Sequence, residues 1–465
     1  MVRKATLAAP PSLDVLCQAT TAMVSSGTSA AACGAPLSLD YLVRLQHSPW
    51  ALEFCLSTLT THGAQLSFAP AYFCATTCAF QLRKGGNFSD EEFIAIRDRL
   101  SQLLVPAAAF DRRLLTPIAS CLIYLMVRMA PTLWNPTSAI ESICSAFGAE
   151  HRGILIEMLT LLPEEVGNKR LSVQKERRLA VTEALRASAP AVVEVLRGLL
   201  LADVDAGRVT VAAAGGRRPA LQTAVLRCFR SWVEFGAVPL EGALACGLLT
   251  AAVSDIVAIG EQEAMEATLA VIAASGGGPT PSSPATPAAA ESALALLRSL
   301  APLSATTAGD AEQRRCALLV LTSAVEVHLP LLLGRRRDVP PNARAEETCA
   351  SVWKLLADAT HALRSSSDFD ILPSFWSSVA ASVGKTVVAA AAAAPIELQV
   401  RAFLPSIAML LLQSCAHPDG LAGEERQRRR QMVQSAVRSI TAVVGSAAVL
   451  SALVVPSDVE GAAAL

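Results

Sequence analysis

Short helix-breaking pairs recur along the chain, and their spacing restricts the fold more than any other feature of the sequence. Each pair contains proline or glycine, so we expect a turn at each. The pairs are Ser48-Pro49, Ala69-Pro70, Gly85-Gly86, Ala130-Pro131, Asn135-Pro136, Leu162-Pro163, Ala189-Pro190, Val238-Pro239 and Ala394-Pro395. Helices of about twenty residues fit between them in pairs, which gives a repeating unit of about 40 residues. The spacing therefore predicts a chain of helical hairpins.

The segments between the breakers have the periodicity of amphipathic helices. In residues 89–104, Ser89 and Glu92 have the spacing of a capping box. An apolar stripe follows at Phe93, Ile96, Leu100, Leu103 and Leu104. Residues 220–236 and 345–363 repeat the pattern, and Trp232 lies on the stripe of the former with Phe229 and Phe235. We expect Trp232 to be buried between repeats.

These hairpins must stack to form a core. Hydrophobic residues make up 52% of the chain but aromatic residues only 5%, so the apolar content lies mainly in alanine and straight-chain helix formers. A single hairpin cannot bury its apolar stripe, whereas stacked hairpins share a continuous core. A period of about 40 residues is that of HEAT and armadillo repeats. We therefore predict an all-α fold, an α-solenoid of HEAT/armadillo-like helical-hairpin repeats forming a superhelix, as a single array over residues 1–465.

Three segments lack apolar periodicity and are predicted to be loops. They are residues 206–219, 275–288 and 334–343, which combine Gly, Pro, Ser or Arg. Residues 275–288, SGGGPTPSSPATPA, are too rich in proline and glycine to fold, and we predict a disordered insertion there.

No constellation of residues in the sequence indicates catalysis. The six histidines have no metal-ligand spacing, and the nucleophile-elbow, dinucleotide-binding and P-loop motifs are missing. The paired acids Glu164-Glu165 and Glu346-Glu347 are predicted at helix ends, where charge complements the helix dipole. We expect a protein that is not an enzyme and has no catalytic residues and no cofactor.

The twelve cysteines are spread singly through apolar segments, without a C-x-x-C pair or a secretory leader. This distribution indicates buried thiols in a reducing compartment. Cys74 and Cys78 are one helical turn apart, but no histidine or second cysteine pair supplies the other ligands of a metal. Core packing is favoured over a metal site.

Charge and hydropathy argue against nucleic acid and membrane as direct partners. The net charge is −1, so no overall field attracts a polyanion. The arginine runs 335–337 and 426–430 lack interleaved aromatic residues, which favours solvated or partner-binding surfaces. Residues 439–457 carry no charge and have the length of a C-terminal anchor, but Gly445-Ser446 predicts a break between two shorter helices. A tail-anchored protein stays as an alternative.

Four segments in this order resemble nuclear transport receptors. They are AYFCATTCAFQLRK (71–84), LIEMLTLLPEEVGNKRLSVQKERR (155–178), VLRCFRSWVEFGAV (225–238) and ERQRRRQMVQSAVRSITAVVGS (425–446). The second resembles an L-x-L-L-P-E-E-V segment, and the third an F-R-C-x-x-S-W motif, of one branch of the importin-β superfamily of karyopherins. That branch contains transportin-SR (transportin-three) and importin-thirteen, and the chain is similar to its N-terminal half.

The resemblance implies a nuclear import receptor that shuttles between nucleus and cytoplasm. Such receptors bind the GTP form of the small GTPase Ran through their N-terminal repeats, here residues 1–150. They carry cargo proteins, which in the transportin-SR branch are Arg-Ser-rich splicing factors, and they contact Phe-Gly nucleoporins in the pore; residues 151–465 would be central repeats. Family members are much longer and more acidic than this chain. A HEAT-repeat protein-interaction scaffold unrelated to Ran is the alternative.

The resemblance also implies where Ran would lie, against the second helices of the first repeats. Here these helices include residues 72–84 and 112–128. Because aromatic residues at helix starts are usually packed, we expect Tyr72 and Phe73 to be covered and favour the polar helix ends. The candidate Ran-binding residues are Gln81, Arg83, Lys84 and Arg128.

Residues 155–178 change from an apolar to a charged segment at Leu162-Pro163. We expect Pro163 to end the first helix of a pair. Residues 169–178 would then form the solvated connection and the first turn of the next helix.

Overall fold

The computed structural model describes residues 7, 9–25, 36–86, 88–147, 150–205, 220–276, 287–335, 343–362, 367–384, 395–416 and 423–454. All regular elements among these residues are helices, and they fall into two compact units. The first unit comprises residues 1–205 and 227–238, and the second comprises residues 206–226 and 239–465. The predicted all-α fold is confirmed.

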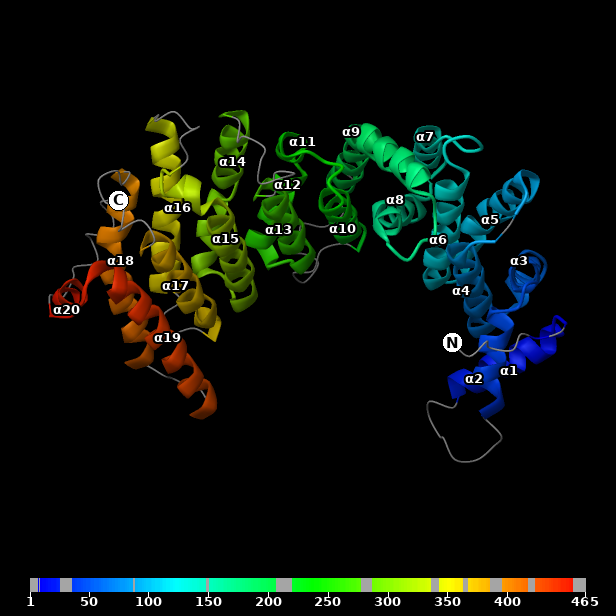
Figure 1. Cartoon of the computed structure of the whole chain (residues 1–465), viewed down its shortest axis with the longest axis horizontal. Coiled ribbons are helices and arrows are strands. Elements are labelled where there is room, and N and C mark those ends of the chain that lie inside the picture. The colour runs from blue at the N-terminus through cyan, green and yellow to red at the C-terminus, as the bar shows by residue number, and fades with distance from the viewer. Residues whose placement is uncertain are drawn as a thin grey trace. The chain divides into compact units, whose positions relative to one another are not determined.

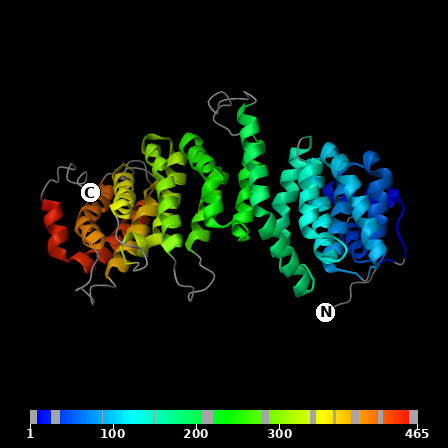
Figure 2. The same ribbon diagram turned by 90° about the horizontal axis from the view of Figure 1, so that it is seen from above.

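The first unit is built from helical hairpins in two layers. Its elements are α1 (Leu13–Ser25), α2 (Pro36–Gln46), α3 (Ala51–His62), η1 (Gly63–Gln65), α4 (Phe68–Lys84), α5 (Asp90–Phe110), α6 (Arg112–Met129), α7 (Pro136–Phe147), α8 (Arg152–Gly167), α9 (Lys175–Asp205) and, from Arg227 on, α10 (Ala220–Glu234). α4 packs on α6 and α6 on α8 in one layer, while α3 packs on α5 and α7 on α9 in the other (Figures 1 and 2). This arrangement is an α-solenoid.

The second unit repeats the architecture. Its elements are α11 (Leu240–Ala245), α12 (Leu248–Ile259), α13 (Gln262–Gly276), α14 (Pro287–Ser299), η2 (Ala301–Ala308), α15 (Ala311–Leu332), α16 (Ala343–Ala362), η3 (Ser367–Asp370), α17 (Ile371–Gly384), α18 (Pro395–Ala416), α19 (Gly423–Val444) and α20 (Ser446–Val454). α13, α15, α17 and α19 follow one another in one layer, and α14, α16, α18 and α20 in the other (Figure 1). Each hairpin thus buries its apolar stripe against its neighbours.

The predicted loops fall largely outside the described residues. Residues 206–219 do so completely, as do 277–286 of the predicted insertion and 336–342 of the third loop. The insertion is narrower than predicted on both sides, because residues 275–276 end α13 and 287–288 begin α14. The predicted boundary at residue 150, between Ran-binding and central repeats, lies inside the first unit. The assignment of these two functions to residues 1–150 and 151–465 stays a prediction.

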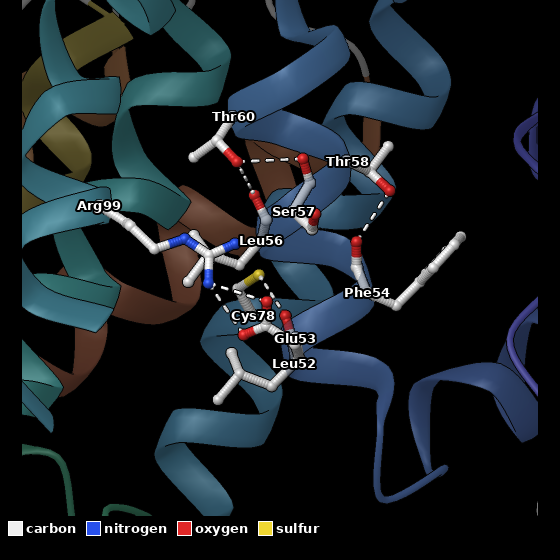
Figure 3. A network of polar contacts seen from close by, with 9 residues as sticks. All are labelled: Leu52, Glu53, Phe54, Leu56, Ser57, Thr58, Thr60, Cys78 and Arg99. Atoms are coloured by element: carbon white, nitrogen blue, oxygen red, sulfur yellow. Dashed lines mark hydrogen bonds and ion pairs between the residues drawn. The ribbon is translucent and has the colours of Figure 1, made fainter. Parts of the chain in front are cut away.

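The predicted capping box is present at the start of α5. The Glu92 amide donates to Ser89 Oγ over 3.2 Å, and the Ser89 amide donates to Glu92 Oε2 over 2.7 Å. Further along α5, Arg99 donates to both carboxylate oxygens of Glu53 on α3, each over 2.9 Å (Figure 3). The box fixes where α5 begins, and the ion pair joins it to the preceding hairpin.

Two predicted breakers do not end a helix. α8 continues through Pro163 to Gly167, and α9 continues through Pro190 to Asp205. The prediction that Pro163 ends the first helix of a pair is therefore wrong. A proline inside a helix leaves the carbonyl four residues earlier without its usual donor, which for Pro163 is the Leu159 carbonyl. In this structure that carbonyl finds another donor.

Trp232 supplies this donor. Its indole Nε1–H donates to Leu159 O over 2.8 Å, and the neighbouring Ser231 hydroxyl donates to Thr160 O over 2.9 Å. The Trp232 side chain is completely buried, as predicted from the stripe that it shares with Phe229. Two segments that are distant in sequence, 155–178 and 225–238, thus meet through side-chain donors and backbone acceptors.

The charged connection after α8 is only partly solvated. Residues 168–174 form the connection and α9 begins at Lys175, so residues 169–178 do span a connection and the first turn of the next helix. Arg178, however, donates to the carbonyls of Val166 (2.7 Å), Asn168 (3.0 Å) and Leu171 (2.7 Å). Arg177 donates to the Arg128 carbonyl at the end of α6. Helix C-termini leave carbonyls without partners and attract cations, so these two arginines cap α8 and α6.

Thiols fill part of the core of the first unit. Cys55 of α3, Cys74 and Cys78 of α4 and Cys121 of α6 are completely buried. The Cys78 thiol lies 4.0 Å from the Leu52 carbonyl (Figure 3). The prediction that Cys74 and Cys78 pack in the core is confirmed. Within the described ranges, no group of three histidine, cysteine or acidic side chains has the arrangement of a metal site.

These thiols predict a loss of stability at alkaline pH. Burial raises the pKa of the Cys228 thiol to about 12, and burial likewise raises the pKa of Cys121. Because a thiol in the unfolded chain titrates near pH ~8.5, the folded state holds its protons more tightly. This contribution to stability is complete below pH ~8.5 and is lost as the pH rises toward 12.

We expect the urea midpoint of the protein to fall between pH 9 and pH 11 by tryptophan fluorescence. The free energy of unfolding should therefore fall with rising pH, and Cys228→Ala should make this fall less steep, by at most about 1.4 kcal/mol per pH unit. An identical slope in Cys228→Ala would contradict the assignment of the alkaline loss to this thiol.

Some helices of the second unit are long and apolar. By length and composition alone, Ala311–Leu332 and Ile396–Cys415 could cross a membrane, and 67% and 44% of these windows are buried inside the structure. α19 and α20 pass the same test only as a pair bent by 116°. The predicted break at Gly445-Ser446 is confirmed, with Gly445 at φ +88°. Residues 455–457 of the uncharged segment 439–457 lie outside the described residues.

Candidate partner-binding groove

A groove of about 740 Å³ runs between α4 and α6 of the first unit. The α4 side chains that line it recur at intervals of three or four residues, as one face of a helix requires. The α4 lining comprises Phe68, Tyr72, Thr76, Ala79, Phe80 and Arg83, and the α6 lining comprises Arg113, Thr116, Pro117, Ser120 and Tyr124, with Gln46 at the edge. Both helices are those that the resemblance places against Ran.

One part of the groove is aromatic and cationic. The rings of Phe68 and Tyr72 stack with centroids 5.3 Å apart, and the Arg113 guanidinium lies 4.0 Å from the Phe68 centroid. Asp111, the N-cap residue of α6, accepts from Arg113 Nε over 3.1 Å and from Nη2 over 2.8 Å, which holds the guanidinium there. Tyr72 is 42% exposed. The expectation that Tyr72 is covered is wrong, because the apolar face of α4 that points into the core does not include it.

Hydroxyl groups of α6 connect the groove to acidic residues of α8. The Thr116 hydroxyl donates to Glu157 Oε1 over 2.5 Å, and the Ser120 hydroxyl donates to Glu165 Oε1 over 3.3 Å. Burial, and next the charge of Glu165, raise the pKa of Tyr124, while Arg83 lowers it. The groove lining therefore presents cations from α4 and α6, while the α8 carboxylates lie outside the lining, bonded to its hydroxyl groups. A cationic lining favours an acidic group of a partner.

Arg83 is the predicted residue that the groove contains. Its side chain is half-buried in the groove lining, and its guanidinium forms no ion pair with any residue that the structure describes. Lys84 follows at the exposed end of α4 and is not part of the lining. An arginine held between aromatic and hydroxyl side chains without a carboxylate partner is suited to bind an acidic group of another molecule.

The other two candidates are occupied by internal hydrogen bonds. Gln81 Nε2 donates to Gln46 O over 2.5 Å and to Ser48 O over 3.3 Å. Arg128 donates from Nε to Leu82 O over 2.9 Å and from Nη2 to Arg83 O over 3.1 Å. The structure therefore brings Arg83 together with Tyr72 and Tyr124, while Gln81 and Arg128 join helices to each other.

Sequence reasoning missed Tyr72, Arg113 and Tyr124 of the groove lining, and for Tyr72 the sequence contains a signal. The residues of α4 at 71, 74, 75, 78 and 82 are small or apolar and buried. The face that carries Phe68, Tyr72, Thr76 and Arg83 is therefore the opposite one, and its mixture of aromatic and polar residues is unusual for a core.

A second groove, of about 630 Å³, is more apolar. It lies where α3, α5 and α6 meet, and its lining from α5 and α6 is mainly aliphatic. The lining comprises Leu59, Thr60, Thr61, Gly63, Ala71, Gln102, Leu103, Pro106, Ala107, Ala109, Leu114 and Ile118. Pro106 lies inside α5, so its missing N–H leaves a backbone acceptor near this groove.

Comparison with known proteins supports one class. Residues 111–272 match the family model described as exportin 1-like protein, which is less than half of the chain. α6 and α8 lie within the match and α4 lies before it. The match supports the importin-β/exportin superfamily and a karyopherin-like nuclear transport receptor, and it favours such a receptor over an enzyme. A crystal structure of an engineered protein has 14% sequence identity and a TM-score of 0.32, and the similarity covers 92% of this chain and 98% of that one. No curated protein matches the chain.

Proposed function

We propose that this protein is a nuclear transport receptor that binds the GTP form of Ran through the α4–α6 groove. It carries protein cargo through the nuclear pore and shuttles between nucleus and cytoplasm. No chemistry is required: the GTPase and the cargo each change the affinity of the receptor for the other, so that Ran binding in the nucleus releases imported cargo. The family match is consistent with a receptor of this kind.

The observation that carries this proposal is the environment of Arg83. Its guanidinium has no ion-pair partner among the described residues, and it lines a groove with the exposed ring of Tyr72. Partly exposed tyrosine and arginine side chains are the types most often found at energetically dominant positions of protein interfaces. The groove is open over two adjacent helices, which suits a loop of a folded partner.

The test is a binding measurement with Ran locked in its GTP and GDP states. The full chain is immobilised and each form is titrated over it at physiological salt. We expect saturable binding of the GTP form and at least tenfold weaker binding of the GDP form. Equal affinity for both forms, or none at practical concentrations, would favour the alternative of an interaction scaffold unrelated to Ran.

The four sequence segments support the transportin-SR branch and the import direction. Arg-Ser-rich splicing factors are then the proposed cargo class, with the repeats of residues 151–465 as the candidate surface. A complex with an Arg-Ser-rich peptide that GTP-loaded Ran dissociates would support import. A complex that requires GTP-loaded Ran would instead support export.

We place the contact with Phe-Gly nucleoporins at the second groove. Its aliphatic lining and its volume of about 630 Å³ suit a phenylalanine ring flanked by glycine. A Phe-Gly repeat peptide should therefore bind, and the matched Ser-Gly peptide should not. Leu103→Asp should weaken this binding roughly tenfold by placing a charge in the apolar lining. Leu179→Asp on α9, where Leu179 is 49% exposed and outside the lining, is the control; equal loss in both variants would argue against this groove.

A further inference from the structure

We infer that Arg128 is a positioning residue, which orders the last turn of α4 so that Arg83 faces the partner. This inference rests on the proposed function of the α4–α6 groove and adds a residue that does not touch the partner. Arg128 lies near the end of α6 and donates to Leu82 O over 2.9 Å and to Arg83 O over 3.1 Å. Both carbonyls belong to the last turn of α4, where no backbone N–H of the helix can reach them.

Gly85 makes this contact possible. The backbone at Gly85 has φ +86°, which ends α4 in a conformation that other residues rarely adopt. A Cβ at Gly85 would lie 2.8 Å from Arg128 Nη2 and 2.9 Å from Nη1. The guanidinium therefore occupies the space that a side chain at position 85 would fill. Gly85 and Arg128 together determine how α4 ends.

Arg128 is itself held in place. Arg177, in the first turn of α9, donates to the Arg128 carbonyl. Burial, and next the charge of Arg177, lower the pKa of Arg128, whose side chain is partly removed from water. Hydrogen bonds from a charged donor in such surroundings are stronger than those at an exposed surface. A chain of contacts thus runs from α9 through α6 to the turn that carries Arg83.

The direction of Arg83 depends on this turn. A helix end without capping frays, and a frayed turn presents its side chains in many directions. Arg83 would then lose the fixed geometry that a charge-assisted contact requires. The inference therefore predicts two linked effects of removing Arg128, local opening of the α4 end and weaker binding of the partner.

The experiment compares Arg128→Met with Arg178→Met in the full chain. Arg178 likewise donates to carbonyls at a helix end, Val166 in α8 and Asn168 and Leu171 after it, but that helix end carries no side chain of the groove lining. Amide hydrogen exchange is measured at the ends of α4 and α8, and the affinity for GTP-loaded Ran is measured for each variant. Arg128→Met should accelerate exchange at residues 82–85 and weaken binding roughly tenfold. Arg178→Met should accelerate exchange only at the end of α8 and leave the affinity unchanged.

Gly85→Ala provides an independent arm, because it disturbs the same contact without changing Arg128. It should reproduce both effects, whereas Arg128→Lys should keep part of the affinity that Arg128→Met loses, through the N–H groups of its single ammonium nitrogen. Normal affinity of Arg128→Met, despite fast exchange at the end of α4, would overturn the inference. Equal loss of affinity in both methionine variants would assign the effect to general destabilisation and overturn it as well. If the unmutated chain does not bind GTP-loaded Ran, the proposed function fails, and the exchange contrast alone decides whether Arg128 orders this turn.

Discussion

Replacing Trp232 with alanine should lower the free energy of unfolding of the first unit by roughly 3–5 kcal/mol. The side chain is completely buried, as is Phe229 on the same stripe, so the truncation leaves a large cavity in the core. The indole N–H also satisfies the Leu159 carbonyl, whose usual donor is missing at Pro163. Urea unfolding followed by far-ultraviolet circular dichroism measures this loss, and an unchanged midpoint would contradict a packed site at Trp232.

A mutant cycle separates the hydrogen bond from the packing. Trp232→Phe keeps most of the ring but leaves the buried Leu159 carbonyl without a donor, at a cost of about 1–3 kcal/mol. Pro163→Ala restores a backbone N–H that can donate to the same carbonyl. In the Pro163→Ala background, Trp232→Phe should therefore cost less than it does alone. Equal cost in both backgrounds would show that the indole N–H and Pro163 are independent.

The helices of this protein could be predicted from the sequence because their signals are local. The capping box of Ser89 and Glu92 and the stripe of α5 depend on residues a few positions apart, and the structure contains both. The prediction that Pro163 ends a helix is wrong because the deciding contact is not local. In α8 the carbonyl that Pro163 frees finds a donor, and that donor is Trp232 on another helix. Nothing within α8 itself contains this information.

The candidate site shows the same division. The sequence resemblance selected α4 and α6, and the structure gives a groove between them that contains Arg83. Gln81 and Arg128 have polar side chains of the kind that contact partner proteins, but they donate to backbone carbonyls of neighbouring elements. Polar side chains near helix ends serve both purposes, and only the position of the next hairpin distinguishes them. Aromatic residues at helix starts are usually packed, and this general tendency gives the wrong expectation for Tyr72. The buried face of α4 does not include Tyr72.

Reversing the charge of Arg83 and Lys84 together, as Arg83→Glu with Lys84→Glu, should slow the association of GTP-loaded Ran with little change in helicity. Like charges placed at the groove oppose the encounter with an acidic group, and the association rate constant should fall roughly tenfold at low salt. The deficit should shrink as the ionic strength rises, because added salt screens exposed charges. Arg186→Glu is a control for charge reversal outside the groove, since Arg186 is exposed on α9 and does not line the groove.

Tyr72→Ala tests the aromatic part of the groove by a different kinetic constant. Removing a partly exposed ring, stacked on Phe68 at 5.3 Å, takes away contact area that forms only after docking. The dissociation rate constant should therefore rise roughly tenfold, with little change in association and little dependence on salt. Surface plasmon resonance measures both constants for each variant.

If the charge-reversal variant and Tyr72→Ala both match the unmutated chain, while that chain distinguishes GTP-loaded from GDP-loaded Ran, the GTPase binds elsewhere. A split between association for the charge reversal and dissociation for Tyr72→Ala would place the partner over Arg83 and Tyr72 together, because steering and contact are then lost at two ends of one groove.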